Sequence, residues 1–157
     1  MNKETKNVFV SHAHEDDGGI TDLKNLLSKA GMSIRDSSIT ADKENRAKSH
    51  DYIKYKILGP HIEWAGALIV YISPKTKDSE WVNWEIRHAR AKGKTIVGVW
   101  ELGASGCEVP EELDGHGDAV VAWNTEKIID AINGNYTKFE NPDGTLRGPR
   151  SIPRHPC

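Results

Sequence analysis

The sequence predicts a three-layer α/β sandwich built around a five-stranded parallel sheet. Two observations lead to this fold class. Short apolar runs alternate with segments of helical periodicity along the chain, and the most apolar run, 67–72, is unbroken rather than alternating. An unbroken apolar run is typical of a strand that is covered on both faces of a parallel sheet. Parallel strands also need crossover connections, which the intervening helices can supply.

The expected strands and helices follow one another in a regular order. Strands are expected at 8–10, 33–35, 67–72, 95–100 and 119–123. Helices are expected at about 20–30, 47–58 and 79–92, then a short turn at 110–113 and a last helix between Asn124 or Thr125 and Gly134. Gly31 and Gly134 stand just past two of these helices, where glycine commonly ends a helix. Gly59-Pro60 interrupts the second helix, and the polar segment 36–45 is expected to be a long loop.

Length and composition fit one folded domain, at 1–134, followed by an extended tail at 135–157 that is either disordered or clamped onto a neighbouring surface. The tail contains four prolines, two glycines and three arginines. A formal net charge of −2 gives no reason to expect nucleic acid as a partner. The longest apolar run, 65–72, is too short to cross a bilayer, and the first residues lack the apolar core of a signal peptide. A cytoplasmic location without membrane contact is therefore expected.

The first strand leads into Ser11-His12-Ala13-His14, followed by Asp16, which is a pattern that resembles the metallo-β-lactamase superfamily. Histidines at this spacing can share a zinc ion. The third histidine of that motif is Asp17 here, however, and few residues precede the first strand. The two cysteines do not suggest a thiolate site either. We therefore expect no metal. The sequence also lacks a P-loop and a G-x-G-x-x-G fingerprint after its first strand.

The most informative segment runs from 73 to 86, where the third strand leads into the third helix. On this helix Val82, Ile86 and Ala89 share one face that can cover the sheet. Trp81, Glu85 and His88 are spaced at i, i+4 and i+7 and are expected on a different stripe. A glutamate beside a tryptophan is thus expected near the carboxyl end of a strand, which is where open α/β sheets bind ligands.

Two motifs in this order resemble the Toll/interleukin-1 receptor (TIR) domain family. One is Ser73-Pro74 followed by Ser79-x-Trp81-x-x-x-Glu85-Ile86, and the other is the first strand, 8–11, with Asp16 downstream. Val82 stands where the family often has cysteine. The resemblance extends from about 8 to 134 and includes the loop after the second strand, which is called the BB loop in this family.

The resemblance implies a flavodoxin-like fold and, as in many bacterial members, cleavage of NAD+ between nicotinamide and ribose. NAD+ would be a substrate, and no cofactor is expected. Stand-alone bacterial TIR-like proteins of this size are similar to the sensor component of Thoeris antiphage defence. In that system a cyclic ADP-ribose isomer or a related conjugate activates a separate effector protein.

Glu85 is the expected catalytic residue. Nicotinamide leaves a pyridinium as a neutral molecule, so an ionised carboxylate that binds the ribose hydroxyls and favours an oxocarbenium-like transition state can suffice. By resemblance, Ser11 and His12 line the same cleft. The remaining substrate-binding candidates lie around the BB loop and on the third helix: Arg35, Lys43 or Arg46 for phosphate, and Asp36 where the loop begins. Trp81 has two possible roles, as a wall for ribose or adenine or in packing within the domain.

Family resemblance further implies a homo-oligomer, because BB-loop residues of one subunit often complete the site of a neighbour. Two other functions remain open from the sequence. One is a non-catalytic TIR-like adaptor that acts through contacts alone, and the other is a nucleoside deoxyribosyltransferase-like enzyme, which shares the layered fold and also uses a glutamate. Glu85 within its Trp-x-x-x-Glu frame favours NAD+ cleavage over the adaptor.

Overall fold

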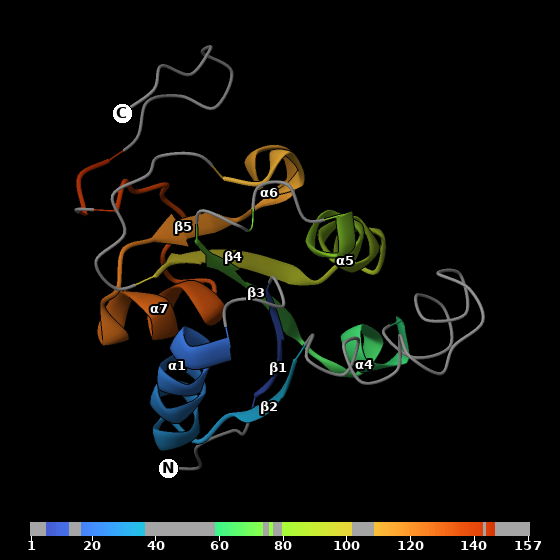
Figure 1. Ribbon diagram of the computed structural model, residues 1–157, viewed down its shortest axis with the longest axis horizontal. Coiled ribbons are helices and arrows are strands. Elements are labelled where there is room, and N and C mark those ends of the chain that lie inside the picture. The colour runs from blue at the N-terminus through green and yellow to red at the C-terminus, as the bar shows by residue number, and fades with distance from the viewer. Residues whose placement is uncertain are drawn as a thin grey trace.

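The computed structural model describes residues 6–12, 17–36, 59–73, 76, 80–101, 109–142 and 144–146. Its core is a five-stranded parallel sheet with the strand order β2-β1-β3-β4-β5 (Figure 1). The strands are β1 (Asn7–Ser11), β2 (Ser33–Asp36), β3 (Ala67–Ile72), β4 (Thr95–Trp100) and β5 (Ala119–Val121). The predicted fold class is confirmed. The loop expected at 36–45 and the helix expected at 47–58 fall almost wholly outside the described residues.

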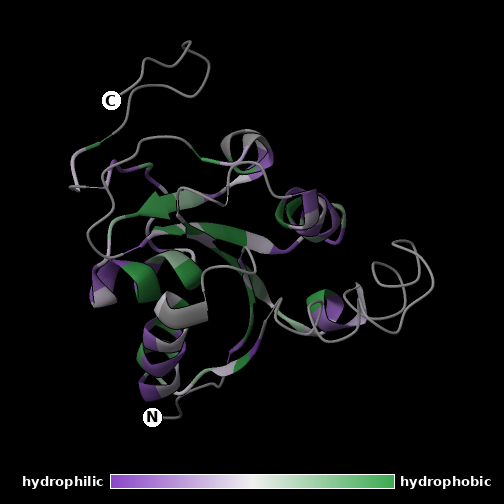
Figure 2. Cartoon of the chain, viewed as in Figure 1, coloured by the Kyte–Doolittle hydropathy of each residue, from purple (hydrophilic) through white to green (hydrophobic). Residues whose placement is uncertain are grey.

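Five helices are described, and they pack on the two faces of the sheet. One face is covered by α1 (Asp17–Lys29) and α7 (Thr125–Ile132), whose Leu23 and Ile128 join one apolar cluster. The other face is covered by α4 (Gly59–Trp64), α5 (Glu80–Ala91) and α6 (Glu111–His116), which form a second cluster. Figure 2 shows mostly apolar strands at the centre of the sheet and apolar stretches on α5 and α7. No helix in the described part of the chain is long and apolar enough to span a membrane.

Several element boundaries differ from the sequence prediction. Gly59 and Pro60 belong to α4, and the helix expected before them, at 47–58, lies outside the described residues. The segment after Pro110 continues beyond a turn into the six-residue helix α6. The last strand stops at Val121, two residues early. The helix ends at Gly31 and Gly134 are as predicted, with φ of 85° and 83°.

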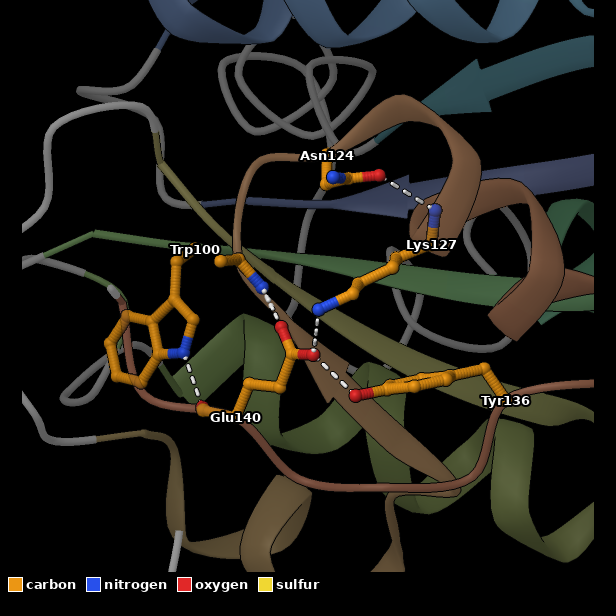
Figure 3. Close-up of polar contacts among 6 residues, drawn as sticks. Trp100, Asn124, Lys127, Tyr136 and Glu140 are labelled. Carbon is orange, nitrogen blue, oxygen red and sulfur yellow. Dashed lines mark hydrogen bonds and ion pairs between the residues drawn. The ribbon is translucent and has the colours of Figure 1, made fainter. Parts of the chain in front are cut away.

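The chain after α7 returns to the sheet and is fastened there by Glu140. The backbone at 138–140 runs beside the outer strand β5, where Val120 N donates to Lys138 O and Glu140 N donates to Val120 O. The Glu140 carboxylate is fully buried and accepts hydrogen bonds from Ala122 N, Lys127 Nζ and the Tyr136 hydroxyl (Figure 3). The Trp100 indole donates to the Glu140 carbonyl over 2.8 Å. The described part of 135–146 therefore packs against the carboxyl ends of β4 and β5.

The strand order places a topological switch point between β1 and β3. The chain leaves β1 through α1 toward β2 on one side, and β3 then adds to the other side of β1. The helices that follow β1 and β3 lie on opposite faces of the sheet. Open α/β sheets bind ligands outside the carboxyl ends of the strands at such a point. The fold thus selects the region around Ser11 and the residues after Ile72 as the place to look for a site.

Candidate functional site

Glu85 lies on the side of α5 that faces the sheet. It is fully buried, together with Val82, Ile86 and Ala89. Glu85 was expected on a separate stripe with Trp81 and His88, and this prediction was wrong. Residue 85 is three positions after Val82 and four before Ala89, so it belongs to the same helical face as both. Trp81 and His88, in contrast, are only partly buried.

The side chain that meets Glu85 comes from the end of β1. Ser11 Oγ donates to Glu85 Oε1 over 2.5 Å, and both residues are fully buried. The two residues are 74 positions apart in the sequence. Successive side chains of a strand point to opposite faces, so Ser11 shares the face of Phe9, whose ring packs in the apolar cluster under α4, α5 and α6. Two side chains that the resemblance assigns to one cleft are thus in direct contact, and their roles in binding and catalysis stay predictions.

More polar side chains are buried at the same edge of the sheet. His12 follows Ser11 and is almost fully buried. After β3, the hydroxyl of Thr76 accepts from Ser73 N over 2.9 Å and donates to Tyr71 O over 2.9 Å. These bonds tie Thr76 to the end of β3. Thr76 was not singled out from the sequence, although threonine side chains in turns often form hydrogen bonds with nearby backbone groups.

Arg35 does not point freely along the edge of the sheet. Its guanidinium carbon lies 4.0 Å from the centre of the Trp64 ring, and its Nη1 lies 3.0 Å from His61 Nδ1. Burial and then the positive charge of Arg35 lower the pKa of His61 below its usual value. In the sheet register Arg35 pairs with Phe9, two positions before Ser11. Arg35 is thus held against α4, and a role in binding phosphate stays a prediction.

The last two predicted site residues are placed less directly. Asp36 ends β2 opposite Val10, and its side chain lies outside the described part. Trp81 is half-buried and packs against the apolar cluster on the α5 face of the sheet. Packing within the domain was one of the two roles considered for Trp81, and a contact with ribose or adenine stays a prediction.

His88, the third member of the expected stripe, makes surface contacts. Its ring stacks on Trp84 with 4.8 Å between ring centres, and its Nε2 lies 3.1 Å from Glu63 Oε2 on α4. The hydrogen bond from His88 lowers the pKa of Glu63. His88 therefore links α5 to α4. Among the described residues no group of three or more histidine, cysteine and acidic side chains is arranged to hold a metal ion. His14 and Asp16, which belong to the zinc-like pattern, are not among them.

Comparison with known proteins assigns the chain to a family. Residues 9–105, which are more than half of the chain and include both Ser11 and Glu85, match the family described as Thoeris protein ThsB, TIR-like domain. The chain belongs to this family. The TIR-like match ends before α6, so the segment fastened by Glu140 lies outside it.

One curated relative of this TIR-like chain is the "Putative cyclic ADP-D-ribose synthase TIR2" of Cytobacillus dafuensis, which is 28% identical over 97 residues. The match covers 61% of this chain and 25% of the relative, so the chain spans about a quarter of that protein's length. Among solved structures, a 2-deoxyribosyltransferase from Bacillus psychrosaccharolyticus is similar with a TM-score of 0.57 and 14% identity. That match covers 78% of this chain and 89% of the other, and it shows a shared fold.

The candidate site of the TIR-like domain is defined by a buried carboxylate, that of Glu85. A carboxylate at a core-facing position is costly unless it is hydrogen-bonded, and an apolar side chain would fill the position at lower cost. Buried ionisable groups with a specific partner, located where a fold binds ligands, are common at functional sites. A carboxylate in this place can stabilise positive charge that develops on a bound sugar. Acid–base or metal chemistry is not needed for that role.

Proposed function

We propose that this chain cleaves NAD+ at the bond between nicotinamide and ribose and releases a cyclic ADP-ribose isomer or a related ADP-ribose signal in antiphage defence. The observation that carries the proposal is the buried Ser11–Glu85 pair at the carboxyl ends of the sheet, beside the β1/β3 switch point. The TIR-like family match and the name of the Cytobacillus dafuensis relative point to the same chemistry.

The reaction uses few groups of the protein. The bond between ribose C1′ and the pyridinium nitrogen breaks, and its electron pair stays with nicotinamide, which departs neutral. Positive charge develops on the ribose ring, where the Glu85 carboxylate stabilises it. A nucleophilic atom of the same ADP-ribose, or a water molecule, then bonds to C1′ and loses a proton. The first outcome gives a cyclic product and the second gives ADP-ribose. NAD+ is a substrate in this scheme, and no other cofactor takes part.

The proposal includes partners and a location. The chain acts in the cytoplasm, as a homo-oligomer in which the BB loop of one copy completes the site of another, and a separate effector protein reads the signal. His12, Arg35, Asp36 and Trp81 are the proposed further contacts of NAD+. Because Glu85 is fully buried, NAD+ reaches it only when the groups around it move apart. Activity therefore has to be measured in infected cells as well as with purified protein.

The test compares wild type with Glu85→Gln and with Glu80→Gln. Glu80 is exposed on the same helix and loses the same charge, so it is the matched control. Small molecules from bacteria that express each form, with and without phage, are separated by chromatography and identified by mass. We expect wild type and Glu80→Gln to lose NAD+ and to accumulate nicotinamide with an ADP-ribose product. Loss of a preorganised electrostatic group typically costs about 100-fold or more in rate, so Glu85→Gln should show almost no product. Equal product from Glu85→Gln would contradict the assignment.

A second candidate function is that of a base-exchange enzyme, because the fold is similar to that of the 2-deoxyribosyltransferase. A base-exchange enzyme would transfer deoxyribose from a deoxynucleoside to a free base and would leave NAD+ intact. Incubation of the purified protein with NAD+, and separately with a deoxynucleoside and a second base, distinguishes the two enzymes. A non-catalytic adaptor would transform neither substrate, and Glu85→Gln would still protect cells against phage.

A further inference from the structure

Ser11 is placed by the strand rather than by a flexible loop. It is the last residue of β1 and pairs with Val70 of β3 in the register of the sheet. The alternation of a strand directs its side chain to the face that α5 covers, and its hydroxyl is fully buried there. The position of the Ser11 oxygen is therefore fixed by the two central strands of the sheet.

Glu85 has the longer and intrinsically more flexible side chain of the pair. A glutamate side chain has several rotatable bonds, and it loses much of their freedom when it is held in one geometry. The hydrogen bond from Ser11 Oγ to Glu85 Oε1 fixes one carboxylate oxygen relative to the sheet. Ser11 thus acts on the orientation of the Glu85 side chain.

We propose that Ser11 is a positioning residue for the reaction and not a contact of NAD+. It holds the Glu85 carboxylate in the orientation that stabilises the developing charge on ribose. This inference rests on the proposed function. It differs from the sequence expectation, in which Ser11 touches the substrate, and the difference is measurable. Loss of a substrate contact raises KM, whereas loss of an interaction that matters in the transition state lowers kcat.

The experiment compares Ser11→Ala, Ser11→Thr and Ser33→Ala in the NAD+ assay. Ser33 is an exposed serine at the start of β2 in the same sheet and serves as the matched control. Ser11→Ala removes the donor and should lower kcat by about 10- to 100-fold with little change in KM, in the range seen for lost charge-assisted hydrogen bonds. Ser11→Thr keeps the hydroxyl and should recover most of kcat. If its extra methyl group prevents folding, Ser11→Cys, which keeps the volume with a weaker donor, should give an intermediate kcat.

A double variant separates positioning from simple packing. Residues that act as a unit are not additive in their effect on rate, so Ser11→Ala combined with Glu85→Gln should be no slower than Glu85→Gln alone. Thermal unfolding of each variant checks that the loss of kcat is not a loss of folded protein. If Glu85→Gln abolishes turnover but Ser11→Ala keeps the wild-type kcat or raises only KM, the positioning role is wrong and the proposed function stands. If wild type consumes no NAD+ in infected cells, the proposed function fails and the inference fails with it.

Discussion

Replacing Glu140 by glutamine tests whether the segment after α7 is an integral part of the domain. The carboxylate is fully buried and accepts three hydrogen bonds, from Ala122 N over 2.9 Å, from Lys127 Nζ over 2.7 Å and from the Tyr136 hydroxyl. Glutamine keeps the shape and one acceptor oxygen, but its amide group then faces a donor. It also leaves the Lys127 ammonium without its ion partner.

The expected cost follows from these contacts. Removing one member of a buried ion pair costs about 3–5 kcal/mol, but the Lys127 side chain is 40% exposed, so water compensates part of the loss. We therefore expect Glu140→Gln to lower the free energy of unfolding by about 2–4 kcal/mol. At about 2–4 °C per kcal/mol for a domain of this size, the midpoint of thermal unfolding should fall by about 5–15 °C.

The assay is unfolding in urea of Glu140→Gln, of Lys127→Met and of the double variant. A coupling energy of about 1 kcal/mol or more between the two positions is expected, because they form one contact. Lys127→Met alone should cost less, since it leaves the carboxylate with its other two donors. A Glu140→Gln protein within about 0.5 kcal/mol of wild type, the range of ordinary surface substitutions, would refute the reasoning.

The same network predicts a dependence on pH. Burial by itself raises the pKa of Glu140, but the hydrogen bonds from Ala122, Lys127 and Tyr136 and the charge of Lys127 outweigh it, so the pKa lies below 4.5. A depressed pKa stabilises the folded protein above the unfolded value. The difference in the free energy of unfolding between wild type and Glu140→Gln should therefore be full above about pH 4.5 and shrink as the pH falls through the folded pKa.

Burial and the bond to Glu140 raise the pKa of Tyr136 from 10.0 to about 12. The contribution of Tyr136 to the stability of the folded protein should be lost as the pH rises through that range.

Two further predictions concern helices, one the packing of α1 and the other the N-cap of α7. A Cβ atom at Gly19 of α1 would lie 1.8 Å from the Tyr71 hydroxyl. Although alanine favours helices, Gly19→Ala should therefore lower the free energy of unfolding in urea by about 1–3 kcal/mol. In a Tyr71→Phe background, which lacks the hydroxyl, the loss should be clearly smaller. An equal cost in both backgrounds would exclude the clash. Asn124 Oδ1 accepts from Lys127 N over 3.0 Å at the start of α7, so Asn124→Ala should cost about 1 kcal/mol and Asn124→Asp should retain stability.

Much of the fold could be predicted because its information is local. The unbroken apolar run at 67–72 indicates a strand covered on both sides, and β3 is fully buried at the centre of the sheet. Helical spacing and glycines past the helix ends located α1 and α7 to within a few residues. Boundaries that depend on tertiary packing, such as the early end of β5, were missed because hydrophobic pattern continues past the last ladder bond.

The site divides in the same way. The family motifs in the sequence selected Glu85, but it was expected on a stripe apart from Val82 and Ala89, and only the structure showed it on their buried face. Only the tertiary structure decided which group meets its carboxylate, because Ser11 lies 74 positions away and approaches through the strand order and register. The position of Arg35 against Trp64 is likewise visible only in the structure. So is the burial of Glu140, which belongs to the segment expected to be a tail. A hydrophobic pattern specifies which face is covered, but contacts between charged side chains depend on how the covered faces are stacked.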